Sequence, residues 1–211
     1  HEYKRQLLNA LHIVHLWIQA RKDPKSIGVP RAFLFGAKSA PGYKSAKLII
    51  RLINGIGEVV NSDAGRTGLR VAFIPNYRVS LAERIIPAAD VSEQISTAGM
   101  EASGTGNMKF SLNGALTIGT LDGANIEIRE RVGAENFFLF GLTTDEVAQR
   151  KREGYRGRTV YESNHDVREV LDLIGSGFFS PEDKHVFKPL VDGLGSHTLR
   201  PGSRTGKFVE S

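Results

Sequence analysis

A glycine-rich segment followed by a lysine is the part of this sequence with the clearest chemical potential. Residues 101–110 read Glu-Ala-Ser-Gly-Thr-Gly-Asn-Met-Lys-Phe. If a helix begins near Thr105, its first N–H groups and the Thr105 hydroxyl can bind an anion. Lys109 then lies one turn further on the same face, about 6 Å along the axis. A phosphate at the turn and an aldehyde at the lysine amine describe pyridoxal phosphate held as a Schiff base, so the segment predicts a site for that cofactor.

Two other phosphate-binding motifs were compared with this segment. A P-loop requires Gly-Lys-Ser/Thr, but Lys109 is preceded by Met108 and followed by Phe110. A dinucleotide fingerprint requires a third glycine where Lys109 stands, although Glu130 lies at a tolerable distance for the acidic residue. Neither motif fits. Taken alone, a Gly-Thr-Gly turn is more often a helix cap than a cofactor site.

Several long segments carry a resemblance to a known family. Residues 76–125 read NYRVSLAERIIPAADVSEQISTAGMEASGTGNMKFSLNGALTIGTLDGAN, and they closely resemble the α-glucan phosphorylases, the family of glycogen, starch and maltodextrin phosphorylases. The segments HEYKRQLLNALH, KSAPGYKSAKLIIRLINGIGEVVN and SGFFSP look like the same family. The resemblance extends over roughly residues 1 to 190. It implies a glycosyltransferase that converts an α-1,4-glucan and inorganic phosphate into glucose 1-phosphate and a shortened glucan.

The resemblance also implies roles for individual residues around the cofactor. Lys109 matches the lysine that holds pyridoxal 5'-phosphate. Thr105, Gly106 and Arg78 match residues near the cofactor phosphate, and Tyr77 matches a residue beside the ring. In this family the cofactor phosphate acts as the acid/base partner of the substrate phosphate, which suits a second phosphate pKa of about 6.

A second group of residues matches the family's substrate site. Lys4 matches a lysine that contacts phosphate groups, and Tyr43 matches an aromatic residue at an inhibitor pocket. The segment that binds glucose hydroxyls is matched by Glu101, Ala102, Ser103 and Gly104. Lys4 and Glu101 are therefore the candidate catalytic residues. The motif contains no pair of carboxylates, which a glycoside hydrolase would need. Without the resemblance, Lys4 and Arg5 would be expected to be surface charges of a first helical turn.

Hydrophobic periodicity predicts strands alternating with helices. Leu7, Leu11, Val14 and Ile18 predict a helix over residues 5–22, and the spacing of Ile49, Ile53, Ile56 and Val60 predicts another. Short apolar or β-branched runs predict strands at residues 32–35, 69–74, 116–121 and 137–140. This order indicates an α/β, doubly wound, mostly parallel Rossmann-like sheet. Tyr77 and the 101–109 segment should follow strand ends, where ligands bind in such folds.

We expect residues 1–192 to form one Rossmann-like domain, incomplete at both ends. The resemblance identifies it as the C-terminal half of a two-domain GT-B-type glycosyltransferase. Residues 193–211 diverge from the family and are expected to be a disordered tail. Met100 stands where the family usually has a small hydroxyl residue.

The chain begins at His1, so the other wall of the active site is expected to be missing and the isolated chain to be inactive. The alternative is a non-catalytic module that binds cofactor or sugar; a pyridoxal enzyme acting on amino acids has only Lys109 in its favour.

Composition adds weaker expectations. The chain has 211 residues, a formal net charge of +5 and no cysteine. Its basic residues are scattered among acidic ones, so we expect no nucleic-acid partner. The six histidines have no metal-binding spacing, so no metal is expected. Without a long apolar run or a signal-like start, we expect a cytoplasmic protein that does not bind membranes. The parent enzyme is expected to be a homodimer.

Overall fold

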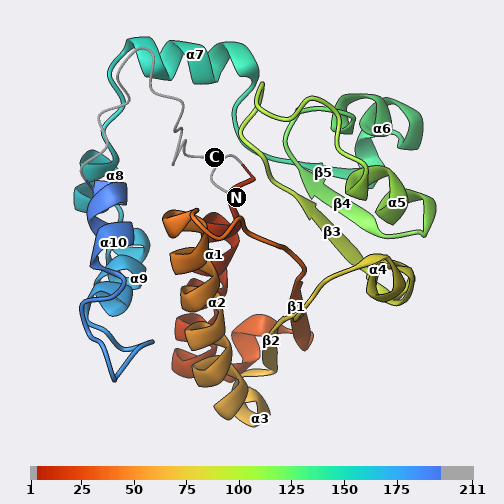
Figure 1. The fold of residues 1–211 in the computed structure, drawn as a ribbon. Helices are drawn as coiled ribbons and strands as arrows, with labels where there is room; N and C mark the ends of the chain where they lie inside the picture. Colours follow the sequence, from red (N-terminus) through yellow and green to blue (C-terminus); the bar gives the residue numbers. More distant parts are fainter. Residues whose placement is uncertain (1–3, 196–211) are drawn as a thin grey trace. The chain divides into compact units, whose positions relative to one another are not determined.

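A computed structural model describes residues 4–195, which divide into two compact units. Among the described residues, unit 1 comprises 4–5 and 78–155, and unit 2 comprises 6–77 and 156–195. Strands alternate with helices along most of the chain, and all paired strands are parallel (Figure 1). The predicted α/β class is therefore confirmed.

Unit 2 is built around two long helices and a parallel strand pair. Strand β1 (Arg31–Phe35) pairs with β2 (Leu69–Phe73), so the two predicted strands are confirmed within one or two residues. The predicted helices are α1 (Gln6–Lys22) and α2 (Lys44–Ser62). The remaining elements of this unit are η1 (Pro24–Ile27), α3 (Ala64–Thr67), α8 (Gly157–Ser163), α9 (His165–Gly175) and α10 (Lys188–Gly195).

Helix α2 shows why this unit is compact. Its buried side chains recur every three or four residues, which gives one apolar face; they include Ile49, Leu52, Ile53, Ile56 and Val60. At the end of the helix, the Asn61 side chain donates to Val71 O at 2.8 Å and accepts from Val71 N at 2.9 Å. This pair of hydrogen bonds fixes α2 on β2, because the amide matches both backbone groups of one strand residue.

Unit 1 is a three-stranded parallel sheet with short helices. The strand order is β3 (Val91–Gln94), β4 (Leu116–Gly119) and β5 (Phe137–Leu139). The runs at 116–121 and 137–140 predicted β4 and β5, whereas β3 was missed because its sequence, Val-Ser-Glu-Gln, is mostly polar. The other elements are α4 (Val79–Ile85), η2 (Ile86–Ala88), α5 (Gly106–Leu112), α6 (Asn125–Val132), η3 (Ala134–Asn136) and α7 (Thr144–Arg152).

The strands differ from the prediction in one respect. The described residues form two parallel sheets, one in each unit, and not one continuous doubly wound sheet. Within each sheet, neighbouring parallel strands are joined through a helical crossover, as a Rossmann-like arrangement requires.

The prediction of a single domain over 1–192 stays a prediction. Helix α10 continues to Gly195, past the predicted start of the tail, and residues 196–211 lie outside the described residues.

A search of the described helices for a membrane span found none that is both long and apolar enough.

Candidate functional site

The turn before α5 carries the predicted cofactor residues. Helix α5 begins at Gly106 with Thr105 as its N-cap, and Lys109 N donates to Thr105 O at 3.1 Å. The predicted helix start is thus confirmed, and Thr105 and Lys109 lie one turn apart. Gly104, just before the cap, has a φ of 83°, a conformation that favours glycine. Both Thr105 and Lys109 are exposed.

The donors of this turn suit a phosphorylated aldehyde. The Thr105 hydroxyl makes no capping hydrogen bond with the first amides of α5. Met108 N donates to Asn107 Oδ1 at 2.9 Å, so the amides of Gly106 and Asn107 are the helix-start donors left for an anion. A Cβ built on Gly106 would meet no atom within 4 Å, so the space beside the turn is open. A free hydroxyl, helix-start amides and an exposed lysine amine fit the two ends of pyridoxal phosphate.

Two buried asparagines hold the turn against the sheet. Asn107 Nδ2 donates to Asn125 Oδ1 at 3.0 Å and to Ser103 O at 3.2 Å. Asn125 Nδ2 donates in turn to Thr120 O at 3.0 Å and Gln94 O at 3.2 Å. Because both amides are buried and paired, they fix the start of α5 relative to the ends of β3 and β4.

A glycine allows the chain to pass close to the same turn. Ala124 N donates to Ser103 O at 2.8 Å, and a Cβ on Gly123 would lie only 2.5 Å from that oxygen. Gly123 also has a φ of 53°. A larger residue at this position would push the Ser103–Gly104 backbone away.

The two candidate catalytic residues meet in unit 1. Lys4 Nζ donates to Glu101 Oε2 although the residues are 97 positions apart in sequence. The Lys4 side chain is 47% exposed and that of Glu101 19% exposed. An ammonium beside a carboxylate can bind a substrate that offers both anionic groups and hydroxyls. The flanking residues Ala102 and Ser103 are exposed, and their binding role stays a prediction.

A buried carboxylate organises the loop that carries Glu101. Asp122 is only 3% exposed and lies just after β4. Its Oδ2 accepts from Ser96 Oγ at 2.5 Å and from Glu101 N at 3.0 Å, and its Oδ1 accepts from Gly99 N at 2.8 Å. Sequence reasoning gave Asp122 no role. The available signal was an acidic residue directly after a strand, where parallel sheets bind ligands.

Arg5 corrects the expectation of a surface charge. It is 5% exposed, and its Nε donates to Ile95 O at 2.6 Å. Burial lowers the pKa of Arg5, and the nearby Asp122 carboxylate opposes that shift. The local pattern failed because it cannot show that the Arg5 side chain bonds to the backbone of Ile95, which is 90 positions away in sequence.

Three further residues were predicted to lie near the cofactor or an inhibitor. Arg78 is the N-cap residue of α4 and donates from Nε to Ser80 Oγ at 3.0 Å. Tyr77 belongs to unit 2, where its ring lies 2.8 Å from the position of a Cβ on Gly36. Tyr43 precedes α2 in the same unit. Proximity of these three residues to a cofactor or inhibitor stays a prediction.

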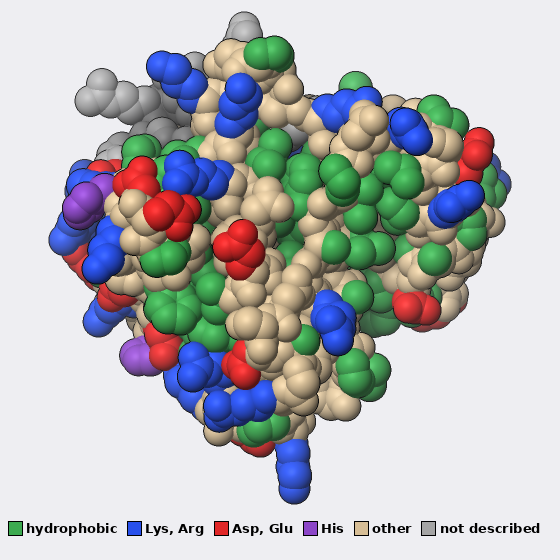
Figure 2. Space-filling model, turned by 60° about the horizontal axis from the view of Figure 1, so that its bottom comes forward, with side chains coloured by type: hydrophobic (Ala, Val, Ile, Leu, Met, Phe, Trp, Pro, Cys, Tyr) green, Lys and Arg blue, Asp and Glu red, His purple; other side chains and the backbone are tan. Residues whose placement is uncertain are grey.

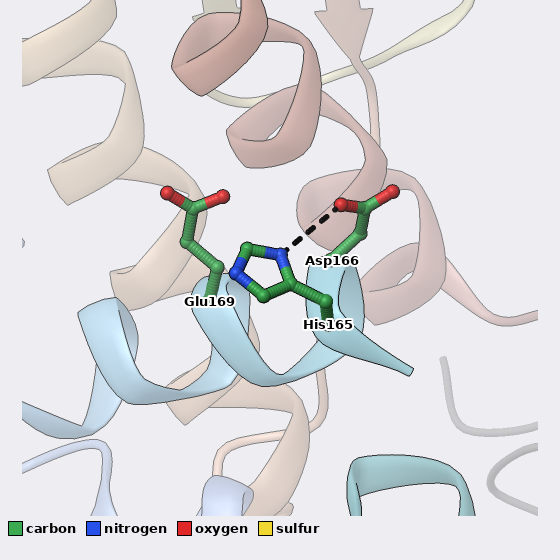
Figure 3. A group of neighbouring side chains, drawn as sticks. All are labelled: His165, Asp166 and Glu169. Carbon is green, nitrogen blue, oxygen red and sulfur yellow. Dashed lines mark ion pairs between the residues drawn. The ribbon is translucent and has the colours of Figure 1, made fainter. Parts of the chain in front are cut away.

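One group in unit 2 has the composition of a metal site. The candidate ligand atoms of His165, Asp166 and Glu169 lie within 4.8 Å of one another at the start of α9 (Figure 3). However, Lys22 Nζ donates to both carboxylate oxygens of Glu169, at 2.9 and 2.8 Å, and so already neutralises this charge. We assign no metal to the group, and the expected absence of a metal stays a prediction.

Charged side chains of both signs are interspersed on the surface in Figure 2, without a single basic stripe on the face that it draws. Mixed charge of this kind is ordinary for a solvated surface. The expected lack of a nucleic-acid partner remains a prediction.

Comparison with known proteins gives a consistent result. The profile of the Phosphorylase family, described as carbohydrate phosphorylase, matches residues 1–199. The chain is 60% identical to a glycogen phosphorylase of Synechocystis over 195 residues, 92% of the chain and 23% of that relative. It is 56% identical to the muscle form of Ovis aries and to the brain form of Homo sapiens, each over 93% of the chain and 24% of the relative. The chain therefore spans about a quarter of the length of these relatives.

Proposed function

The chain belongs to the carbohydrate phosphorylase family, and from this premise we propose that it is part of a glycogen phosphorylase. The proposed reaction transfers glucose from the end of an α-1,4-glucan to inorganic phosphate and gives glucose 1-phosphate. The observation that carries the proposal is the 60% identity over 92% of the chain, which includes the 101–110 segment. The relatives matched over 92–93% of the chain are named glycogen phosphorylases, so the alternative of a non-catalytic module is not favoured.

Unit 1 would hold the cofactor, and the donors at the start of α5 support this proposal. Lys109 would bind the aldehyde end of pyridoxal phosphate, and Thr105 with the amide of Gly106 would bind its phosphate. Arg78 and Tyr77 are proposed neighbours on the basis of the family resemblance. When bound, the cofactor supplies a phosphate whose second pKa of about 6 allows proton exchange near neutral pH.

The residues of the chain would act mainly by orientation and charge. Glu101 has its amide tied to Asp122, so its carboxylate is held in place to accept hydrogen bonds from glucose hydroxyls. Lys4, beside Glu101, would place a positive charge near the substrate phosphate. The exposed backbone of 102–104 offers further polar groups to the sugar. Fixed groups of this kind stabilise a transition state because they need no rearrangement.

Three wider proposals rest on the family alone. The parent enzyme would have the GT-B architecture, with this chain in its C-terminal half. It would act as a homodimer, and it would work in the cytoplasm.

The first prediction concerns the covalent anchor. After incubation of the chain with pyridoxal phosphate and reduction with borohydride, peptide mapping should find the label on Lys109. Lys109→Arg should lose the label, because its guanidinium does not form the imine. Lys47→Arg, at an exposed position on α2, is the matched control and should keep it. Label on Lys38 or Lys47 in place of Lys109 would contradict the site.

The second prediction concerns turnover. A chimera would carry this chain in place of its counterpart in the Synechocystis relative, so that every other part of the enzyme is present. It should release glucose 1-phosphate from maltodextrin and phosphate, and Lys109→Ala in the chimera should remove the activity. We expect the 211-residue chain alone to stay at background, because it spans only 23% of that relative. A chimera that retains the cofactor on Lys109 but has no activity would contradict the proposed reaction.

A further inference from the structure

We infer that Asp122 and Arg5 are positioning residues that hold the 95–101 loop from two sides and so bring Glu101 and Lys4 together. The inference rests on the proposed function, because it assigns the loop to the glucan site. It starts from two observations that the family match does not supply: both charged side chains are almost fully buried, and both make hydrogen bonds to the same short loop.

Asp122 binds the donors of the loop. Its two carboxylate oxygens accept from the Ser96 hydroxyl and from the amides of Gly99 and Glu101. An ionised carboxylate has two acceptor oxygens and no donor hydrogen, so it can accept hydrogen bonds from all three donors at once. Asparagine has the same shape but only one acceptor oxygen. The charge of Asp122 is therefore required by the loop and not merely tolerated in it.

Arg5 binds the acceptors of the same loop. Its Nε donates to Ile95 O at 2.6 Å, and one terminal nitrogen lies 3.4 Å from Ser96 O. Its guanidinium carbon is also 5.8 Å from the centre of the Phe140 ring. The carbonyl groups at the start of the loop thus face Arg5, and the amides further along face Asp122. The Asp122 carboxylate also raises the pKa of Arg5, against the larger lowering by burial.

This arrangement connects two residues that are distant in sequence. Glu101 is tied to Asp122 through its own amide, and Lys4 is the immediate neighbour of Arg5. Arg5 has a φ of 53°, an uncommon conformation for a residue other than glycine. Arg5 is bonded to the loop and Glu101 is part of it. Lys4, the neighbour of Arg5, is therefore within hydrogen-bond reach of Glu101. Thr120 adds a further anchor, since its hydroxyl donates to Ser96 O at 2.6 Å.

The first experiment measures the loop directly and does not depend on activity. Hydrogen exchange of the 211-residue chain should show faster exchange at 96–101 in Asp122→Asn, by tenfold or more, with α2 unchanged. Asp145→Asn is the matched control, because Asp145 is an exposed carboxylate of the same unit. If Asp122→Asn does not fold, Ser96→Ala removes one of the hydrogen bonds and should give a smaller increase in the same segment. Unchanged exchange at 96–101 would overturn the inference.

The second experiment asks whether loop position matters for the reaction. In the chimera, kcat per cofactor-loaded enzyme should fall by about tenfold to a hundredfold in Asp122→Asn, as expected for misplaced reacting groups. Label on Lys109 should be retained, which separates positioning from loss of folding. Arg5→Met should act similarly. The double variant should lose less than the product of the two single losses, because both residues hold the same loop.

The two proposals fail in different ways. A wild-type chimera without activity would contradict the proposed function, while the exchange data would still decide whether Asp122 holds the loop. Faster exchange at 96–101 together with an unchanged kcat would show that the loop is held by Asp122 but that its position does not serve the reaction. That result would overturn the positioning role and leave the proposed function intact.

Discussion

At the scale of single residues, the half-buried Glu93 has a strongly shifted carboxyl pKa. This residue lies on β3, and burial raises the pKa of its carboxyl group from 4.5 to about 7. Between these values the folded state binds more protons than the unfolded state. The contribution of Glu93 to the free energy of unfolding therefore falls as pH rises from about 4.5 to about 7. Burial therefore favours the neutral form of the Glu93 carboxyl group.

Glu93→Gln should remove this pH dependence. At pH 8 the glutamine variant should be more stable than the parent by at most about 3 kcal/mol, because it carries no charge to bury. At pH 4.5 the two proteins should be similar. Native-state hydrogen exchange at β4, the neighbour of β3, measures the effect. Glu83→Gln, at an exposed position on α4, is the control and should leave the profile unchanged. A profile that is equally steep in Glu93→Gln would contradict the assignment.

At the scale of elements, close approach of backbones decides which glycines are needed. Gly55 lies in the middle of α2, where a Cβ would come within 2.2 Å of Phe179 O. Gly65 lies in α3, where a Cβ would meet no atom within 4 Å. Helix propensity favours alanine over glycine at both positions. Only the neighbouring backbone distinguishes them.

The two substitutions should therefore have opposite signs. Gly65→Ala should raise the free energy of unfolding by about 0.4–1 kcal/mol, because it restricts the unfolded chain. Gly55→Ala should lower it by about 1–3 kcal/mol, because α2 and the 179 segment must move apart. Urea unfolding followed by Trp17 fluorescence reports both changes, since Trp17 lies 6.4 Å from the Phe179 ring. Stabilisation by Gly55→Ala would show that this contact is loose.

At the scale of the whole molecule, the described residues divide into two compact units. Trp17 is the only tryptophan of the chain and belongs to unit 2, whereas Asp122 belongs to unit 1. Asp122→Asn should therefore reduce exchange protection in the β3–β5 sheet more than it shifts the urea midpoint of Trp17 fluorescence. Asp145→Asn should change neither quantity. Equal shifts of both measurements in Asp122→Asn would mean that the units unfold as one cooperative structure.

Local patterns in the sequence predicted most of the elements. Apolar spacing predicted α1 and α2, and β-branched or apolar runs predicted four of the strands. The glycines and Thr105 predicted the start of α5 and the one-turn separation of Thr105 from Lys109. These features depend on residues within a few positions of one another, so they can be read directly from the chain.

The tertiary structure decided what depends on residues far apart in sequence. Polar β3 became a strand because β4 pairs with it, and Arg5 became buried because the carbonyls of Ile95 and Ser96 accept its hydrogen bonds. The pairing of Lys4 with Glu101 was not predicted, because the two residues are 97 positions apart and no local pattern connects them. Asp122 was overlooked because a single acidic residue has no periodicity. Its proposed positioning role follows only from the three donors that the fold brings to its carboxylate.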